Sequence, residues 1–248
     1  MQFQFGATQI TVNIPNQTAL LDVVAQRLAA HQGFALATIN LDHLVKLSRS
    51  DSFRAAYAAQ DFVVADGNPI VWLSRLAAKP VELVPGSDMV LPLARLAAKA
   101  GVGVGMVGST DAALEAAAAH LMREVPGLIV TMRHAPPMGF DPASADAASI
   151  FAELTARNVG LCFVALGAPK QEAFAARGRS LAPQIGFASI GAGLDFLAGN
   201  QTRAPKWVRA IAMEWAWRAL SSPRRLIPRY AACAAILPAQ LRDAYRQR

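Results

Sequence analysis

Residues 34–69 read FALATINLDHLVKLSRSDSFRAAYAAQDFVVADGNP and carry the pattern that decides the fold. Two short apolar runs, Phe34–Ile39 and Phe62–Ala65, flank a longer stretch with helical character, Leu44–Ala59. A strand, a helix and a second strand in this order are typical of a βαβ unit with parallel strands. Polar residues follow each apolar run at once. The sequence therefore predicts a parallel sheet with polar side chains at its carboxyl edge.

The same alternation continues along the chain. Further strands are predicted at Val102–Val107, Leu128–Met132, Leu161–Ala165 and Gly186–Ile190. Further helices are predicted near Leu20–His31, Met89–Lys99, Ala112–Glu124, Ala143–Arg157 and Gln171–Leu181. We therefore expect a Rossmann-like α/β fold, with a mostly parallel sheet and helices on both faces. In such open sheets ligands bind beyond the carboxyl ends of the strands, so functional residues should lie there.

Positive charge is concentrated at the end of the chain. Residues 201–248 contain ten Lys and Arg against Glu214 and Asp243, a net charge of +8, whereas the whole chain carries +7. Residues 1–200 therefore sum to −1. The basic segment also holds three of the four tryptophans, Trp207, Trp215 and Trp217. We predict two domains, a Rossmann-like domain over residues 1–200 and a basic, Trp-rich helical appendage over residues 201–248.

The appendage should consist of short helices and bind an anionic surface. One apolar helix face is expected from Trp207, Ile211 and Trp215. A second segment starts near Pro223, and Pro228 and Pro238 are expected to divide it into short pieces. Basic residues attract both nucleic acid and the cytoplasmic face of a membrane. Because indole rings settle at the headgroup level, the tryptophans favour the membrane and exclude nucleic acid as the expected partner.

Composition excludes several other classes of protein. The chain contains no run of 18 apolar residues, so no transmembrane helix is predicted. The start of the chain has no signal-peptide pattern. Cys162 and Cys233 lie in apolar runs and are expected to be buried thiols of a cytoplasmic protein. The four histidines have no metal-ligand spacing, and the chain contains no Asp-x-Asp motif. We therefore expect neither a metal nor another cofactor.

Thr38 and Asn40 end one predicted strand, and Asp66, Gly67 and Asn68 follow the next. These two polar ends should be neighbours. Burial beside apolar residues would raise the pKa of Asp66 toward that of a useful general base. The alternative is that Asp66 only caps the following helix, and the local sequence favours neither interpretation.

Glycines and polar residues follow three more strands. The residues Gly103 to Gly108 match G-x-G-x-x-G, but the first two glycines fall inside the strand, which favours packing over dinucleotide binding. Gly108 and Ser109 instead lie at a helix start, where backbone N–H groups either hold phosphate or form an ordinary turn. Lys170 is a candidate for pairing with a phosphate and Gln171 for binding a nucleoside, although ordinary capping and surface charge would also explain these two residues. The turn from Gly191 to Asp195 is a third candidate.

Together these motifs resemble the WecG/TagA/CpsF glycosyltransferases, glycosyltransferase family 26. The resemblance covers roughly residues 34–230. The matching segments, in the family's order, are Thr38-x-Asn40, Ala65-Asp66-Gly67-x-Pro69, Trp72, Pro85-Gly86-Ser87-Asp88, Gly167-x-Pro169-Lys170-Gln171-Glu172, Gly191-x-Gly193-x-Asp195-Phe196, Gly199, Arg203-Ala204-Pro205, Glu214-Trp215, Arg218, Pro223, Arg225-Leu226 and Arg229-Tyr230.

The resemblance implies a reaction and a place for it. A sugar of the N-acetylmannosamine, N-acetylmannosaminuronic acid or glucose type would pass from a UDP-sugar to a polyprenyl-diphosphate-linked saccharide. Transfer would invert the anomeric centre, need no metal, and serve cell-surface polysaccharide or exopolysaccharide synthesis. The enzyme would lie peripherally on the inner face of the plasma membrane.

The resemblance also implies residue roles. Asp66 matches the family's base, and Thr38, Asn40, Gln171 and Asp195 match residues that line its pocket. The family's C-terminal appendage closes over the site and contacts the membrane. In place of a metal, the cations available to neutralise a diphosphate are the arginines of the appendage, Arg203, Arg218, Arg225 and Arg229.

Two positions depart from the family pattern. Leu83 stands where an arginine is frequent, which leaves the donor and acceptor open, and Ser222 replaces an acidic residue. Two other functions remain as alternatives: a non-catalytic nucleotide-binding membrane adaptor and an NAD-type oxidoreductase. The oxidoreductase lacks the acidic residue expected about 20 positions after a dinucleotide fingerprint. The sequence leaves open whether the chain forms a homo-oligomer.

Overall fold

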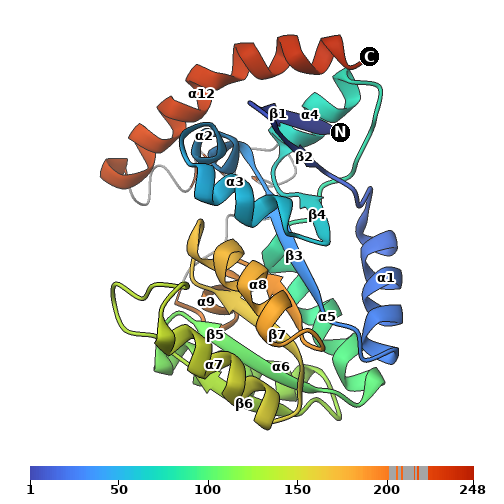
Figure 1. Cartoon of the computed structure of the whole chain (residues 1–248), viewed down its shortest axis with the longest axis vertical. Helices are drawn as coiled ribbons and strands as arrows, with labels where there is room; N and C mark the ends of the chain where they lie inside the picture. The colour runs from blue at the N-terminus through green and yellow to red at the C-terminus, as the bar shows by residue number, and fades with distance from the viewer. Residues whose placement is uncertain (201–204, 206–207, 209–214, 216, 218–222) are drawn as a thin grey trace.

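The computed structural model describes residues 1–200, 205, 208, 215, 217 and 223–248 (Figure 1). At its centre is a six-stranded sheet with the strand order β4-β3-β8-β7-β5-β6. The strands are β3 (Phe34–Ile39), β4 (Phe62–Ala65), β5 (Gly103–Gly108), β6 (Val130–His134), β7 (Val159–Ala165) and β8 (Gly186–Ser189). Every pairing within it is parallel, which confirms the predicted Rossmann-like α/β fold.

Helices cover both faces of the sheet (Figure 1). One face carries α1 (Gln17–Ala29), α5 (Gly86–Ala100), α6 (Asp111–Glu124) and α9 (Gly193–Leu197). The other carries α2 (Leu41–Arg49), α3 (Asp51–Ala58), α4 (Asn68–Leu76), α7 (Ala145–Ala156) and α8 (Lys170–Leu181). Side chains of β3 alternate between the two faces, as the pleat requires: Phe34 and Leu36 join the first core, Ala37 and Ile39 the second.

The register of β3 and β4 brings the two predicted polar ends together. Ile39 pairs with Ala65, and the backbone N–H of Asp66 donates to the carbonyl of Ile39 at 2.8 Å. Asn40 and Asp66 therefore leave neighbouring strands side by side, as the sequence predicts.

The predicted helix Leu44–Ala59 is wrong in one respect, because the structure divides it into α2 and α3 at Ser50. Ser50 is extended, with φ −135° and ψ 114°, and its hydroxyl accepts a hydrogen bond from the N–H of Phe53 at 3.2 Å. A serine in this position offers the backbone an alternative to continuing the helix, and it caps the next helix instead.

An N-terminal hairpin of β1 (Gln2–Phe5) and β2 (Thr8–Thr11) was not predicted from the sequence. Its strands pair antiparallel around Gly6, whose φ is +60°. Four-residue strands give too short an alternation for a sequence pattern to separate from a loop. The hairpin packs its buried Phe3 and Ile10 against the core beneath α3 and α4.

The C-terminal segment forms one long helix, α12 (Pro223–Arg246), so the prediction of short pieces is wrong. Each internal proline removes one hydrogen bond from the ladder and costs roughly 3 kcal/mol, which packing of the helix must offset. Buried residues on one side, Leu226, Cys233 and Ala244, anchor both halves of α12 to the same body. Figure 1 shows α12 crossing the end of the molecule that holds α2 and α4, and it contacts both helices.

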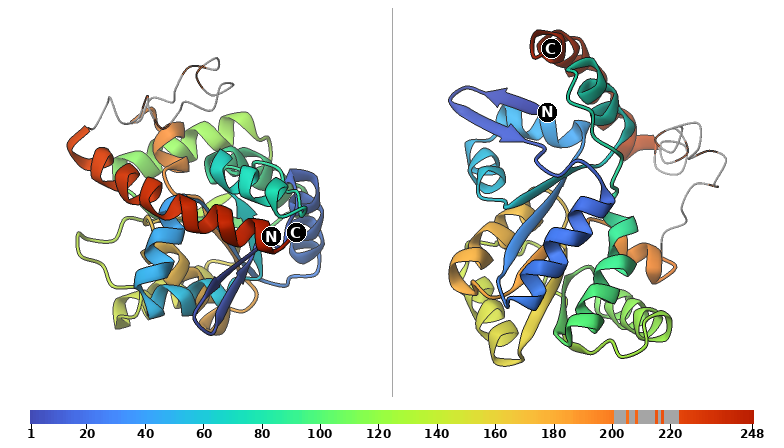
Figure 2. Two further views of the ribbon diagram at one scale, coloured as in Figure 1. Left: turned by 90° about the horizontal axis from the view of Figure 1, so that it is seen from above. Right: turned by 90° about the vertical axis from the view of Figure 1, so that its right-hand side faces the viewer.

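The two ends of the chain are tied together. The backbone N–H of Gln2 donates to Oε1 of Gln247 at 3.2 Å, and Nε2 of Gln247 donates to the carbonyl of Gln2 at 2.7 Å. Figure 2 shows the termini side by side. The end of α12 is therefore fixed to the N-terminal hairpin.

Cys162 in β7 and Cys233 in α12 are buried free thiols, as expected. Burial raises the pKa of each thiol above its usual value. No helix within the described residues is long and apolar enough to cross a membrane.

Candidate active site

Asp66 lies half-buried at the carboxyl end of β4. The hydroxyl of Thr38, on the neighbouring strand, donates to Oδ2 of Asp66 at 3.4 Å. Asp66 does not cap α4, because the cap residue is Gly67 and no side chain of the described residues caps the first turn. The φ of Gly67 is +124°, a conformation that favours glycine and turns the chain directly from Asp66 into the helix. The alternative that Asp66 only caps the following helix is therefore wrong.

Thr38 is held in place from the interior. Its backbone carbonyl accepts a hydrogen bond from the hydroxyl of Tyr57 at 2.8 Å, and that hydroxyl lies 2.7 Å from Nδ1 of His43. Because Tyr57 gives its only proton to Thr38, Nδ1 of His43 must carry the hydrogen that Tyr57 accepts. Burial, and then the positive charge of Lys46, lower the pKa of His43 to about 3, so the imidazole is neutral. A buried chain from His43 through Tyr57 thus fixes the residue that contacts Asp66.

Asn40 and Asn68 flank Asp66 on neighbouring turns. Oδ1 of Asn40 caps α2 by accepting the N–H of His43 at 3.1 Å. A Cβ added to Gly67 would lie 3.7 Å from that of Asn40, so the two turns are in contact. Asn68 is half-buried as the first residue of α4. Thr38 therefore contacts the carboxylate of Asp66, and Asn40, Gly67 and Asn68 lie on the same two strand-end turns.

Gln171 lies at the start of α8 and is almost fully buried, at 2% exposure. Its Oε1 accepts the backbone N–H of Gly191 at 3.2 Å, and its Nε2 donates to Oε1 of Glu172 at 2.8 Å. Both ends of the Gln171 amide are thus engaged within the protein. Lys170, the preceding residue, is partly exposed. Gln171 joins the β7–α8 turn to the β8–α9 turn, and Lys170 is the residue of this pair that faces solvent.

Ser109 and Asp195 come together from β5 and α9. The hydroxyl of Ser109 donates to Oδ1 of Asp195. Ser109 adopts a positive φ of 59°, and the preceding Gly108 has a φ of +116°. A Cβ added at Gly108 would collide with the backbone carbonyl of Ala165 on β7, so this turn requires glycine. The predicted turns around Gly108 and Gly191 therefore share one edge of the sheet with Asp66.

The other glycines of the G-x-G-x-x-G sequence have a packing role. A Cβ on Gly103 would lie 2.9 Å from Cγ2 of Thr131, and one on Gly105 would lie 2.6 Å from Cδ2 of Leu154. Both glycines are within β5 and are needed because neighbouring side chains approach the strand closely. These packing contacts explain both glycines, so dinucleotide binding is not needed to account for them.

Of the four appendage arginines predicted to bind a diphosphate, Arg229 lies near this edge and pairs with an acidic side chain of α2. Nη2 of Arg229 lies 3.0 Å from Oδ2 of Asp42, which also pairs with Lys46 at 2.8 Å. Burial of Asp42 would raise its pKa, but the hydrogen bond from Lys46 and the charge of Arg229 outweigh it and the pKa is lowered. Arg225 lies in α12, and Arg203 and Arg218 lie outside the described residues. Arg229 therefore joins α12 to α2 through Asp42, which lies two residues after Asn40.

Metal-ligating side chains do not gather at this edge. Within the part of the chain that the structure describes, no three His, Cys, Asp or Glu side chains lie close enough to share a metal ion. Positive side chains do approach it: Nζ of Lys46 donates to the carbonyl of Ala168, just before Lys170, at 3.2 Å.

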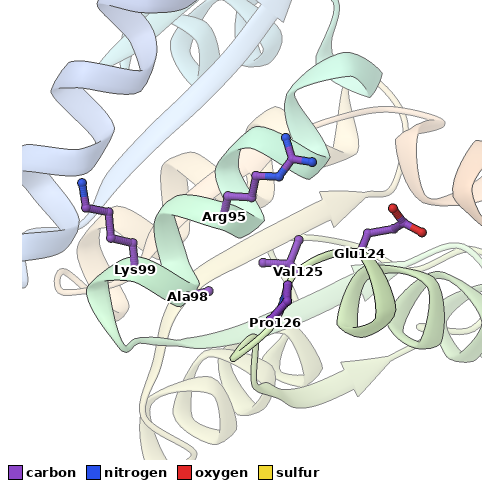
Figure 3. Close-up of a pocket in the computed structure, with 6 residues that line it drawn as sticks. All are labelled: Arg95, Ala98, Lys99, Glu124, Val125 and Pro126. Carbon is purple, nitrogen blue, oxygen red and sulfur yellow. The ribbon is translucent and has the colours of Figure 1, made fainter.

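A shallow hollow of about 360 Å³ lies elsewhere (Figure 3). It is lined by Arg95, Ala98, Lys99, Glu124, Val125 and Pro126. These residues belong to the far ends of α5 and α6. The near end of α5 is at the edge, since a Cβ on Gly86 would lie 3.1 Å from Cγ2 of Thr38. Arg95 is about 13 Å further along that helix, so the hollow is separate from the candidate site.

The sequence patterns assigned no role to three residues at or beneath the edge: His43, Tyr57 and Glu172, of which only Glu172 lies in a segment that matches the family. All three lie on helices at positions that look like ordinary members of an amphipathic pattern. A buried polar residue gives a signal only where its partner is known, and the partners here lie on other elements.

The sequence matches a known family over nearly its whole length. The model described as "Glycosyl transferase WecG/TagA/CpsF family" matches residues 7–248. An N-acetylglucosaminyldiphosphoundecaprenol N-acetyl-beta-D-mannosaminyltransferase of Bacillus spizizenii strain W23 is 27% identical over 210 residues, 82% of this chain and 79% of the relative. The protein of the same description from Bacillus subtilis strain 168 is 25% identical over 236 residues, 90% of each chain.

Proposed function

The chain belongs to the WecG/TagA/CpsF family of glycosyltransferases, and on that premise we propose the reaction that it catalyses. It is a transferase of lipid-linked polysaccharide synthesis. We propose that it moves a sugar from a UDP-sugar to a saccharide carried on polyprenyl diphosphate. The names of the two relatives favour an N-acetylmannosamine-type donor and an N-acetylglucosamine acceptor over the uronic acid and glucose alternatives.

The observation that carries this proposal is the position of Asp66 beside Thr38 at the carboxyl edge. Asp66 takes the proton from an acceptor hydroxyl while that oxygen attacks the anomeric carbon of the donor. The bond between the anomeric carbon and the phosphate oxygen breaks, and UDP leaves. A single displacement of this kind inverts the anomeric centre. General-base assistance contributes about 100- to 10,000-fold in rate.

Cationic and N–H groups stabilise the UDP that leaves. Lys170 at the start of α8 and the turn at Gly108 and Ser109, which leads into α6, are proposed to bind a phosphate, because the first N–H groups of a helix have no acceptor within the helix. Arg203, Arg218, Arg225 and Arg229 of the appendage would add further positive charge. We propose that these groups act without a metal ion.

The appendage, residues 201–248, is proposed to associate with the inner face of the membrane and to complete the site built by residues 1–200. The outer side of α12 exposes Ile227, Leu241 and Tyr245. Residues 227 and 245 are 18 positions apart, which is about five helical turns, so they lie on one side of the helix. Arg224, Arg242, Arg246 and Arg248 are exposed beside them. Apolar side chains with flanking arginines are typical of a helix that lies in an anionic membrane surface.

A donor screen tests the proposed function. Purified protein is incubated with a polyprenyl-diphosphate N-acetylglucosamine and each UDP-sugar, with and without EDTA, and lipid products are read by mass spectrometry. We expect one UDP-sugar to give a product longer by one sugar, unaffected by EDTA. A strict requirement for Mg²⁺ or Mn²⁺ would contradict the metal-free reaction.

Calorimetry separates the two alternatives. Binding of UDP without turnover of any donor would support a non-catalytic adaptor, and binding of NAD in place of UDP would support an oxidoreductase.

A further inference from the structure

Glu172 is a fully buried carboxyl beneath the candidate site, with 0% exposure. One oxygen, Oε1, accepts the hydrogen bond from Nε2 of Gln171 at 2.8 Å. The other oxygen, Oε2, is buried and has no hydrogen-bond partner among the described residues. Carboxyl groups are almost never fully buried unless they are paired, so this one requires an explanation.

Glu172 determines which way the Gln171 amide points. Because Oε1 of Glu172 accepts the amide NH₂, the amide oxygen faces the opposite way and accepts the N–H of Gly191 at 3.2 Å. Gly191 opens the turn into α9, which carries Asp195, the partner of Ser109. Three turns of the carboxyl edge therefore depend on one acceptor oxygen.

We propose that Glu172 is a positioning residue that works as a neutral carboxylic acid and fixes Gln171 and the Gly191 turn for donor binding. The kinetic part of this proposal rests on the glycosyltransferase function proposed above. Glu172 does not touch the reacting atoms, and it acts through Gln171.

The surroundings of Glu172 favour the neutral form. Burial raises its pKa to about 7, against the opposing hydrogen bond from Gln171 and the charge of Lys46 on α2. Tyr57 on α3 is a second titratable group that interacts with it. Strands β3, β7 and β8 present no charged side chain to it, and α7 packs on α8 through Phe151. Since Oε1 accepts a hydrogen bond, the proton belongs on Oε2.

Two substitutions distinguish the role of the acceptor oxygen at position 172 from the role of the carboxyl charge. Glu172→Gln keeps an acceptor oxygen and is neutral at every pH, whereas Glu172→Leu has a similar volume and no acceptor. Glu153→Gln, on the partly exposed carboxyl of α7, is the matched control.

Kinetics with the UDP-sugar give the first readout. For a single proton titrating near pH 7, wild-type kcat/KM should fall about tenfold between pH 6 and pH 8, and the control should behave alike. Glu172→Gln should match wild type within about threefold at pH 6 and lose this decline. Glu172→Leu should raise the donor KM about tenfold or more with little change in kcat, as expected when an indirect binding contact is lost.

A second readout does not depend on any activity. Between the ordinary carboxyl pKa of 4.5 and about 7, Glu172 holds a proton in the folded protein that it loses in the unfolded chain. The contribution of Glu172 to stability should therefore fall as pH rises through this window, and stability should rise more with pH in Glu172→Gln than in wild type. Amide exchange at Gly191 should be faster in wild type at pH 8 than the intrinsic pH effect explains, and this excess should vanish in Glu172→Gln.

The outcomes are distinct. If no donor is turned over, the proposed function fails and the stability and exchange measurements still test Glu172. If Glu172→Leu does not fold, Glu172→Gln decides alone. A Glu172→Gln variant with the wild-type pH dependence of stability and of Gly191 exchange would overturn the proposal.

Discussion

Tyr57 joins residues that no sequence pattern connects. Its hydroxyl donates to the carbonyl of Thr38 and accepts from His43, and Thr38 in turn contacts Asp66. The strand-end residues Thr38 and Asp66 could be predicted because an apolar run ending in a polar residue marks the edge of a parallel sheet. The residues that hold them could not, since the pairing of His43 with Tyr57 depends on how two helices pack.

Replacing Tyr57 with phenylalanine removes one buried hydroxyl and leaves two buried polar groups without their partner. We expect a loss of about 1–3 kcal/mol in the free energy of unfolding. Urea unfolding measures it, with Tyr245→Phe as the control because Tyr245 is 64% exposed and should change stability by less than about 0.5 kcal/mol. Equal stability of the two variants would show that the chain from His43 to Thr38 holds nothing in place.

His43 predicts a separate loss of stability in acid. Its pKa is about 3 in the folded protein against an ordinary value of 6.5, so the unfolded chain binds more protons between these values. The contribution of His43 to stability should therefore be complete above pH 6.5 and be lost as pH falls toward 3, by up to about 1.4 kcal/mol per pH unit. Urea unfolding across this range in the Glu172→Gln background, which removes the opposing carboxyl, should show the slope. The same slope in a variant that also carries His43→Gln would rule out His43 as its source.

At the scale of elements, the central sheet followed from the sequence and the boundaries of helices did not. Apolar runs of four to six residues predicted all six strands of the sheet. Ser50 divided one predicted helix, because its hydroxyl is a good cap, and two prolines failed to divide α12. Local chemistry sets a preference in both cases, and packing against the rest of the protein decides whether the preference is followed.

The turn after β5 is an element whose geometry makes a sharp prediction. Gly108 and Gly127 both have positive φ, but only Gly108 has neighbouring atoms where a side chain would be. Gly127→Ala should cost about 1 kcal/mol for the backbone conformation alone. Gly108→Ala should cost at least about 2 kcal/mol more, because the backbone of Ala165 cannot move away without disturbing β7. Urea unfolding of both variants checks this, and similar losses would show that the β5–β7 contact is adaptable.

At the scale of the whole molecule, α12 is part of the body as well as a candidate membrane surface. Its inner side contributes Ala244 to the core, and Arg229 and Gln247 tie it to α2 and to the N-terminal hairpin. The charge asymmetry of the sequence predicted an anionic partner for this segment but gave no sign that its inner side completes the fold. Deleting residues 201–248 should therefore abolish both membrane binding and transfer, but it would also uncover part of the core.

Substitutions on the outer side of α12 give a cleaner test of membrane association. The double variant Ile227→Glu/Leu241→Glu changes exposed side chains only and should reduce co-sedimentation with anionic vesicles at least tenfold, because each charge opposes insertion and the anionic surface. Ile129→Glu, at a residue 61% exposed and remote from α12 in the sequence, is the control. Added salt should weaken wild-type binding. Vesicle binding by the double variant equal to that of the control would place the membrane contact elsewhere.

The measurement that tests the central claim most directly compares wild type with Asp66→Asn in sugar transfer to the polyprenyl-diphosphate acceptor, in buffer containing EDTA. Mass spectrometry follows the lipid product, while unfolding and UDP binding establish that the variant is intact. Wild type should form a product longer by one sugar, and Asp66→Asn should turn over about 100- to 10,000-fold more slowly with unchanged fold and UDP affinity. An intact Asp66→Asn variant that keeps more than about a tenth of the wild-type rate would contradict the account.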